Sequence, residues 1–262
     1  MTTFRIQSTQ IADGFVQNSP FQHFSADVFP FINPIHWLHS HFAVGGWSPL
    51  QRLSGMLTAH MTHIAPRNGF TWHPHRGLEI YTWVLEGKLY HEDTTGGKGI
   101  LEAGDLQRMF SGDYIEHQEL NSWDEPARVI QIWYIAQRHY QGLPPHYQQV
   151  GKGQLPKYQV GNADVYHLIG AESPMDSHIE GRLTATFVSH NNTTTLEAPD
   201  MGESLFLYVT DGEGIMTYDG QDIPLKQYDV VLARPDVEIA SIRGTSNKEL
   251  SFMNFYLPEF LG

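Results

Sequence analysis

Short runs of β-branched and aromatic residues, each closed by Gly, Asp, Asn or Pro, recur along almost the whole chain, and long helical patterns are hard to find. The run Ile80–Leu85 meets the run Lys88–Asp93 across Glu86-Gly87, which predicts a hairpin. The segment Ala127–Ala136 is apolar on both sides and is expected to form a buried strand. Together these runs are typical of an all-β sandwich or barrel.

A second block of the sequence repeats this pattern. Ser204–Thr210 and Ile215–Tyr218 flank an Asp-Gly turn and predict another hairpin, and Leu250–Leu257 resembles the buried strand that ends the first block. Such a repeat suggests that one domain has been duplicated.

Two pairs of segments align the blocks independently. Val84–Gly87 matches Val209–Gly212 at an offset of 125 residues, and the stretches Ala103–Phe110 and Lys226–Ala233 match at an offset of 124 when Asp105 is placed on Asp229. We therefore expect an N-terminal barrel in residues 1–140, a linker rich in Pro, Gly and Gln in residues 141–158, and a C-terminal barrel in residues 159–262.

Charge and composition narrow the class of protein. The 262 residues carry a formal net charge of −13 and include no cysteine. Negative charge repels nucleic-acid phosphates and anionic membranes, so we expect no direct contact with either. The lack of cysteine excludes disulfides, thiolate metal ligands and a cysteine nucleophile. No signal peptide or membrane-spanning apolar run is visible, so a soluble, cytoplasmic protein is expected.

The segment Trp72–Gly77 reads Trp-His-Pro-His-Arg-Gly and carries the first candidate ligands. Pro74 favours an extended conformation for His73. In an extended chain the side chains at i and i+2 lie on the same face, so His73 and His75 are expected to point the same way. Two imidazoles placed in this way can reach one metal ion.

The segment Ile115–Glu119 carries the second pair. If it is a strand, His117 and Glu119 share a face by the same rule. Three imidazoles and one carboxylate suit a divalent transition metal, and Fe, Mn, Ni, Cu and Zn are all possible ions. Four protein ligands in an octahedral shell leave two adjacent positions for substrate and dioxygen.

The same residues resemble a known family. His73-Pro74-His75-Arg76-Gly77, Glu79, the Val-Leu-Glu-Gly turn and a following His-x-Asp-x-x-Gly resemble the first cupin motif as pirins carry it. The stretch from Ala103 to Glu119 resembles the second motif. The likeness is dense over roughly residues 36–150 and weak afterwards.

The resemblance implies two tandem cupin barrels, that is, double-stranded β-helix or jelly-roll barrels. It also implies one metal, usually iron, bound in the first barrel by His73, His75, His117 and Glu119. In pirins the motif-two glutamate takes the ligand role, so Glu79 is expected to be structural. The 124–125-residue offset carries the ligand positions onto residues of other types, so the second barrel is expected to bind no metal. That offset places His117 on Ser241 or Ile242, and Glu119 on Arg243 or Gly244.

Other histidines and aromatic residues are expected to play lesser parts. Surface or second-layer positions are expected for five histidines near the first motif: His36, His39, His41, His60 and His63. Solvated positions are expected for five later histidines: His139, His146, His167, His178 and His190. Five aromatic residues could shape a flat pocket: Trp37, Phe42, Trp72, Phe110 and Trp133. One or two of them are expected to face the metal, and Trp72 and Phe110 are favoured because they lie near the ligand segments.

The leading functional interpretation is a metal-dependent dioxygenase of the quercetin 2,3-dioxygenase type. Its substrates would be dioxygen and an aromatic flavonol or enediol, and Glu119 would act as the base that removes a substrate hydroxyl proton. An alternative from another class is a non-enzymatic pirin-like protein whose iron state regulates contact with a protein partner. A third interpretation is a cupin that binds a sugar, or serves a structural role, without metal.

Overall fold

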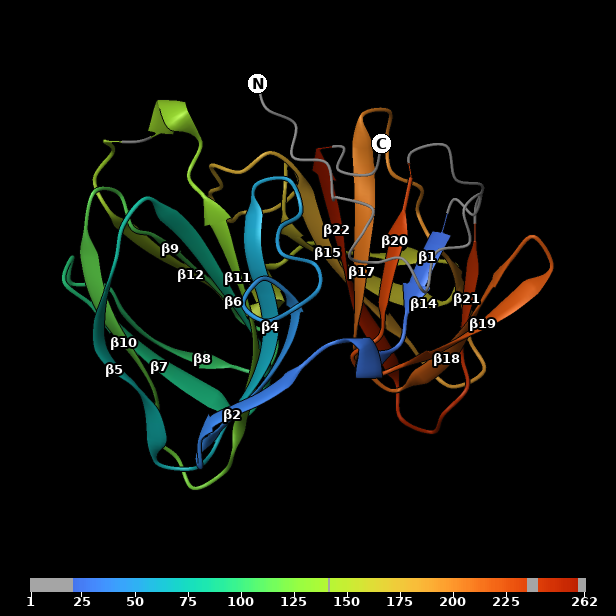
Figure 1. Cartoon of the computed structure of the whole chain (residues 1–262), viewed down its shortest axis with the longest axis horizontal. Coiled ribbons are helices and arrows are strands. Elements are labelled where there is room, and N and C mark those ends of the chain that lie inside the picture. Colours follow the sequence, from blue (N-terminus) through green and yellow to red (C-terminus); the bar gives the residue numbers. More distant parts are fainter. Residues whose placement is uncertain (1–20, 141, 235–239, 259–262) are drawn as a thin grey trace. The chain divides into compact units, whose positions relative to one another are not determined.

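A computed structural model describes residues 21–140, 142–234 and 240–258, and it is almost entirely β-structure (Figure 1). The chain forms two compact cupin barrels. Short 3-10 helices are present at η1 (Ala26–Val28), η2 (Arg138–Tyr140) and η3 (Lys152–Gln154). Among the described residues, no helix has both the length and the apolar character that a membrane crossing requires.

The N-terminal barrel comprises residues 30–155 and 173–179 and contains two sheets. The larger sheet contains, in spatial order, β12 (His146–Val150), β9 (Leu106–Phe110), β6 (Leu78–Glu86), β11 (Ala127–Ile135), β4 (Met56–Ile64), β3 (Leu38–Val44) and β2 (Phe31–Ile35). The smaller sheet contains β5 (Asn68–His75), β10 (Ile115–Asn121), β7 (Lys88–Asp93) and β8 (Lys98–Glu102).

The C-terminal barrel repeats this architecture. Its larger sheet contains, in spatial order, β1 (Phe21–Phe24), β20 (Val230–Ala233), β17 (Glu203–Asp211), β22 (Leu250–Pro258), β15 (Arg182–Val188), β14 (Ala163–Ile169) and β13 (Lys157–Val160). Its smaller sheet contains β16 (Thr193–Thr195), β21 (Ser241–Gly244), β18 (Glu213–Tyr218) and β19 (Gln221–Lys226). The matching strand orders confirm the all-β duplication.

Both predicted hairpins are wrong. β6 pairs with β9 and β11, so both of its edges are occupied and β7 pairs instead with β8 and β10 in the other sheet. Gly87, with φ 71°, turns the chain from one sheet into the other, and a Cβ there would collide with the carbonyl oxygen of Pro126. The same change of sheet separates β17 from β18.

Contrary to expectation, neither barrel is a single continuous stretch of the chain. Within the expected linker 141–158, β12 pairs with β9 at the edge of the first barrel. The strand β1, which precedes the first barrel in the sequence, fills the corresponding edge of the second barrel by pairing with β20 (Figure 1). A sequence offset aligns residues but does not identify the chain segment that completes each sheet edge.

Candidate metal centre

His73 and His75 lie on β5, which among the described strands pairs with β10 alone and so forms an edge of its sheet. Because β5 is at an edge, Pro74 can occupy it without breaking a central ladder. The two histidines are half-buried, while Pro74 between them is exposed. This alternation places the two imidazoles on one face, as the sequence predicts.

His117 and Glu119 lie on β10, where buried and partly exposed residues alternate along the whole strand. Both side chains are on the buried face, with 1% and 3% of their surface exposed. His117 is opposite His73, but the register then shifts, so that Glu119 is opposite Phe70. The shift adds one residue to β5 between these two pairs.

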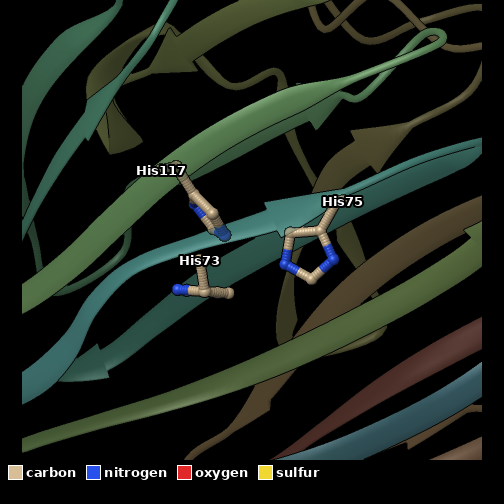
Figure 2. Close-up of side chains that lie close together, drawn as sticks. All are labelled: His73, His75 and His117. Carbon is tan, nitrogen blue, oxygen red and sulfur yellow. The ribbon is translucent and has the colours of Figure 1, made fainter.

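The three histidines form a compact group. Their nitrogen ligand atoms all lie within 4.8 Å of one another. The ring centroid of His117 is 4.3 Å from that of His73 and 5.0 Å from that of His75. Figure 2 shows that the rings come from two neighbouring strands and converge on a common space.

Glu119 lies beside this group and is held by neutral donors. Its Oε1 accepts hydrogen bonds from Gln107 Nε2 at 2.5 Å and from the Thr82 hydroxyl at 3.4 Å. Its Oε2 accepts a hydrogen bond from Gln131 Nε2 at 2.8 Å. A carboxylate has about four lone-pair sites, so these bonds orient Glu119 and still leave it able to bind a cation.

Two histidines of the group, His75 and His117, are held neutral. Burial and the neighbouring histidines lower the pKa of His117 to about 2. Burial and His73 lower the pKa of His75 to about 4, although Glu119 opposes the shift. Neutral imidazole is the form that binds a metal, so the group is ready for a cation at neutral pH.

The unpaired atoms of the group fit a metal ion. Neither ring nitrogen of the buried His117 has a hydrogen-bond partner among the described residues. A buried polar atom without a partner costs about 1–3 kcal/mol, so such an arrangement calls for a ligand. Imidazole nitrogens with one carboxylate suit Fe, Ni, Cu or Zn better than Mg or Ca.

His91 is the residue that the sequence argument missed. It lies on β7, is fully buried, and forms a second donor group with His117 and Glu119, whose ligand atoms also lie within 4.8 Å of one another. The signal was present as the His of the His-x-Asp-x-x-Gly motif, but no role was assigned to it.

Glu79 has a structural environment. It is fully buried and forms an ion pair with Arg108, which is also buried. The carboxylate also accepts hydrogen bonds from the Tyr81 hydroxyl at 2.7 Å and from the backbone amide of His178 at 3.0 Å. These partners agree with the structural role expected for Glu79.

Two expectations about neighbouring side chains are wrong. Trp72 is 46% exposed, and Phe110 is buried with its ring 4.7 Å from that of His178. The aromatic ring near the ligands is instead that of Trp133, which lies 5.1 Å from the ring of His75. His178 is not merely solvated, because Arg108 Nη2 lies 2.9 Å from its Nδ1. Proximity in sequence to a ligand strand therefore failed to select the side chains that approach the ligands in space.

The other histidines are divided between surface and interior. Four of those expected to be solvated or at the surface are exposed: His36, His139, His146 and His190. His39, His60, His63 and His167 are partly buried, and His41 is fully buried. Burial lowers the pKa of His60 to about 4, and the negative charge of Glu119 opposes this shift.

The C-terminal barrel has apolar residues where the first barrel has the donors. In the first barrel Glu119 is opposite His91, and the corresponding pair in the second barrel is Ile242 opposite Met216. Ala240, two residues before Ile242, then corresponds to His117. All three pack in the core of that barrel. Ala240 and Ile242 lie one or two residues before the positions expected from the sequence offset, and neither alignment supplies a ligand set.

Comparison with known proteins agrees with this fold and these motifs. Residues 47–134 match the profile of the Pirin family. Pirin-like protein 2 of Arabidopsis thaliana is 28% identical over 201 residues, which cover 72% of this chain and 61% of that protein. A protein of Zymomonas mobilis named "Putative quercetin 2,3-dioxygenase" is 50% identical over 70 residues, or 27% of this chain and 30% of that protein. The chain thus spans less than two thirds of each relative.

A solved structure shares the fold over nearly the whole chain. The bacterial pirin YhhW of Escherichia coli, in complex with nickel(II), matches with a TM-score of 0.74 and 22% identity. The match covers 91% of this chain and 99% of that protein. The shared fold therefore extends beyond residues 47–134, the segment that the family profile covers.

Proposed function

The chain belongs to the pirin family, and on that premise we propose that its N-terminal barrel binds one transition metal ion and acts as a dioxygenase on flavonol or enediol-like substrates. The observation that supports the metal is the convergence of His73, His75 and His117, with both ring nitrogens of the buried His117 unpaired in the described structure. Glu119 is the fourth proposed ligand, and iron is the ion we favour.

The ligand arrangement supports this proposal through its chemistry. A bound transition ion supplies Lewis acidity and one-electron chemistry with dioxygen. Three histidines and one carboxylate leave the coordination shell of a six-coordinate ion incomplete. The quercetin dioxygenase name of the Zymomonas relative and the nickel in the E. coli pirin support the same assignment.

Glu119 is the proposed base. Its carboxylate is buried and oriented by Gln107 and Gln131, so its position is fixed before a substrate arrives. A carboxylate oxygen of Glu119 would accept the proton of a substrate hydroxyl, which converts an enol into the more electron-rich enolate.

Trp133 is the proposed contact for an aromatic substrate. Its ring is half-buried and lies 5.1 Å from His75, and its indole N–H donates to Gln131 Oε1 at 2.9 Å. Because the same Gln131 donates to Glu119, one side chain sets the position of both the aromatic surface and the base.

Oxygen uptake tests this function. Protein loaded with Fe(II) is mixed with quercetin, and dioxygen consumption and loss of the flavonol absorbance are followed together. We expect both signals from the wild-type protein and neither from Glu119→Gln. Full metal loading without oxygen uptake across flavonols and other enediols would contradict the enzyme and favour the non-enzymatic regulator.

A further inference from the structure

A second group of metal-binding atoms lies deeper in the N-terminal barrel and shares His117 with the first. Its members are His91, His117 and Glu119, with 0%, 1% and 3% of their surface exposed. In the first group, by contrast, His73 and His75 are only half-buried. The two groups therefore differ in depth. The carboxylate of Glu119, proposed above as the fourth ligand of the outer ion, lies within 4.8 Å of the donor atoms of the deeper group.

Asp93 determines which nitrogen of His91 is free. The carboxylate Oδ2 lies 3.0 Å from His91 Nε2, and Oδ1 accepts hydrogen bonds from the Thr95 amide and hydroxyl and from the Gly97 amide. With three donors on its Oδ1, the Asp93 carboxylate acts as an acceptor, so His91 Nε2 donates to Oδ2 and Nδ1 keeps its lone pair.

The free nitrogen of His91, Nδ1, is buried and has no hydrogen-bond partner among the described residues. A carboxylate that orients a histidine through one nitrogen, and so presents the lone pair of the other, is the arrangement that supports metal-binding histidines. Asp93 and His91 have this arrangement, and the lone pair completes the deeper group.

The orientation of His91 is fixed by its surroundings. Its ring stacks on Tyr147 of β12, with centroids 4.3 Å apart and an angle of 8° between the planes. Gly97 leaves room for this arrangement, because a Cβ there would collide with the Asp93 carboxylate and with Tyr147. The position of His91 is thus held by three separate segments of the barrel.

The second barrel shows what these positions contain without a ligand. Met216, Ala240 and Ile242 occupy them and pack in the core. Apolar side chains can fill a buried interior without hydrogen-bond partners, whereas buried polar atoms cost free energy unless they are paired. The unpaired nitrogens of His91 and His117 therefore point to a ligand in the first barrel.

We propose that His91, His117 and Glu119 form a deeper binding position for the transition ion, used in alternation with the outer position formed by His73, His75 and His117. This inference rests on the metal centre proposed above. A neutral imidazole offers one lone pair, because its other nitrogen carries the proton, so the two positions share His117 and hold one ion in turn. Two histidines and one carboxylate are the ligand set of non-haem iron sites, so the deeper position is the one suited to Fe(II).

Cobalt titration tests the deeper position without any activity assay. Co(II) is added to metal-free protein, and its visible absorption and the bound metal content are measured. We expect one Co(II) per chain in wild type. The His73→Ala/His75→Ala double variant should still bind one Co(II), about 10–100-fold more weakly and with a changed spectrum. Adding His91→Gln should weaken binding at least a further tenfold.

A matched control comes from the same strand. Glu92 lies on β7 next to His91, but its carboxylate pairs with Lys98 and accepts hydrogen bonds from Tyr90 and Gln118 outside the donor group. Glu92→Gln in the double variant should leave the cobalt affinity unchanged. If the His91→Gln protein does not fold by circular dichroism, His91→Phe replaces it, since a phenyl ring can keep the stack on Tyr147.

The outcomes separate this inference from the proposed function. A wild type that binds cobalt beside a double variant that binds none would overturn the deeper position and leave the outer one intact. Equal affinity with and without His91 in the double variant would also overturn it. A wild type that binds no cobalt would remove both the deeper position and the metal centre on which it rests.

Discussion

His117 lies opposite His73 across the β5–β10 pair, and the centroids of their rings are 4.3 Å apart. Two protonated imidazoles at this separation would repel each other in a partly dry site. The arrangement is therefore compatible with neutral histidines or with a cation between them.

Glu119→Gln should reduce metal affinity at least tenfold while the barrel stays folded. The change removes the negative charge and turns an amide N–H₂ toward one of the two amide donors, Gln107 or Gln131. Metal content after dialysis, measured by elemental analysis, checks this expectation. Glu116→Gln on the same strand is the control, because Glu116 is on the other face of β10; an equal loss in both variants would contradict the role of Glu119.

Gln131→Met should weaken metal binding by about tenfold, which is the usual size of the effect when a residue that hydrogen-bonds to a metal ligand is replaced. Methionine is close in length but cannot donate to Glu119 or accept from Trp133. The carboxylate would then lose its orientation without losing its charge. Competition with a chelator of known affinity measures the change, and unchanged affinity would show that Glu119 needs no support from Gln131.

Glu79→Gln should destabilise the N-terminal barrel by about 3–5 kcal/mol, because it leaves the buried Arg108 without its counter-ion. Urea unfolding followed by tryptophan fluorescence measures the loss. The folded variant should still bind one metal ion, since Glu79 is engaged by Arg108, Tyr81 and the His178 amide. Loss of metal from the folded variant would instead make Glu79 a ligand.

The sequence could predict the ligand strands because alternation is a local property. Pro74 and the spacing of His73 and His75 determine one shared face, and the alternation of β10 determines the other. Strand pairing was not predictable in the same way. The turn at Gly87 indicated a hairpin, but whether β7 returns to β6 depends on β9 and β11, which lie far away in the sequence.

His91 and Trp133 show the same limit at the site. His91 approaches His117 and Glu119 because β7 pairs with β10, and Trp133 approaches His75 from β11 in the other sheet. Neither relation follows from spacing along the chain. Glu79 was assigned correctly as structural, but its partner Arg108 becomes visible only through the pairing of β6 with β9.

Acid should destabilise the metal-free protein, and His60 should contribute. Burial lowers the pKa of His60 from 6.5 to about 4. At a pH between these two values, His60 therefore binds a proton in the unfolded chain but not in the folded chain. Stability is therefore lost as the pH falls through this window, by about 2–3 kcal/mol for His60 at pH 4.5. Urea unfolding at pH 7 and 4.5 should show a smaller loss in His60→Gln, whereas exposed His36→Gln should behave as wild type.

Metal content of the wild type beside His117→Ala tests the central claim most directly, because His117 belongs to both donor groups. Each protein is incubated with Fe(II) without oxygen, freed of excess metal and analysed, and circular dichroism verifies the fold. We predict one ion per chain in the wild type and almost none in the folded variant. A wild type without metal, or a His117→Ala protein that retains as much as the wild type, would contradict the account.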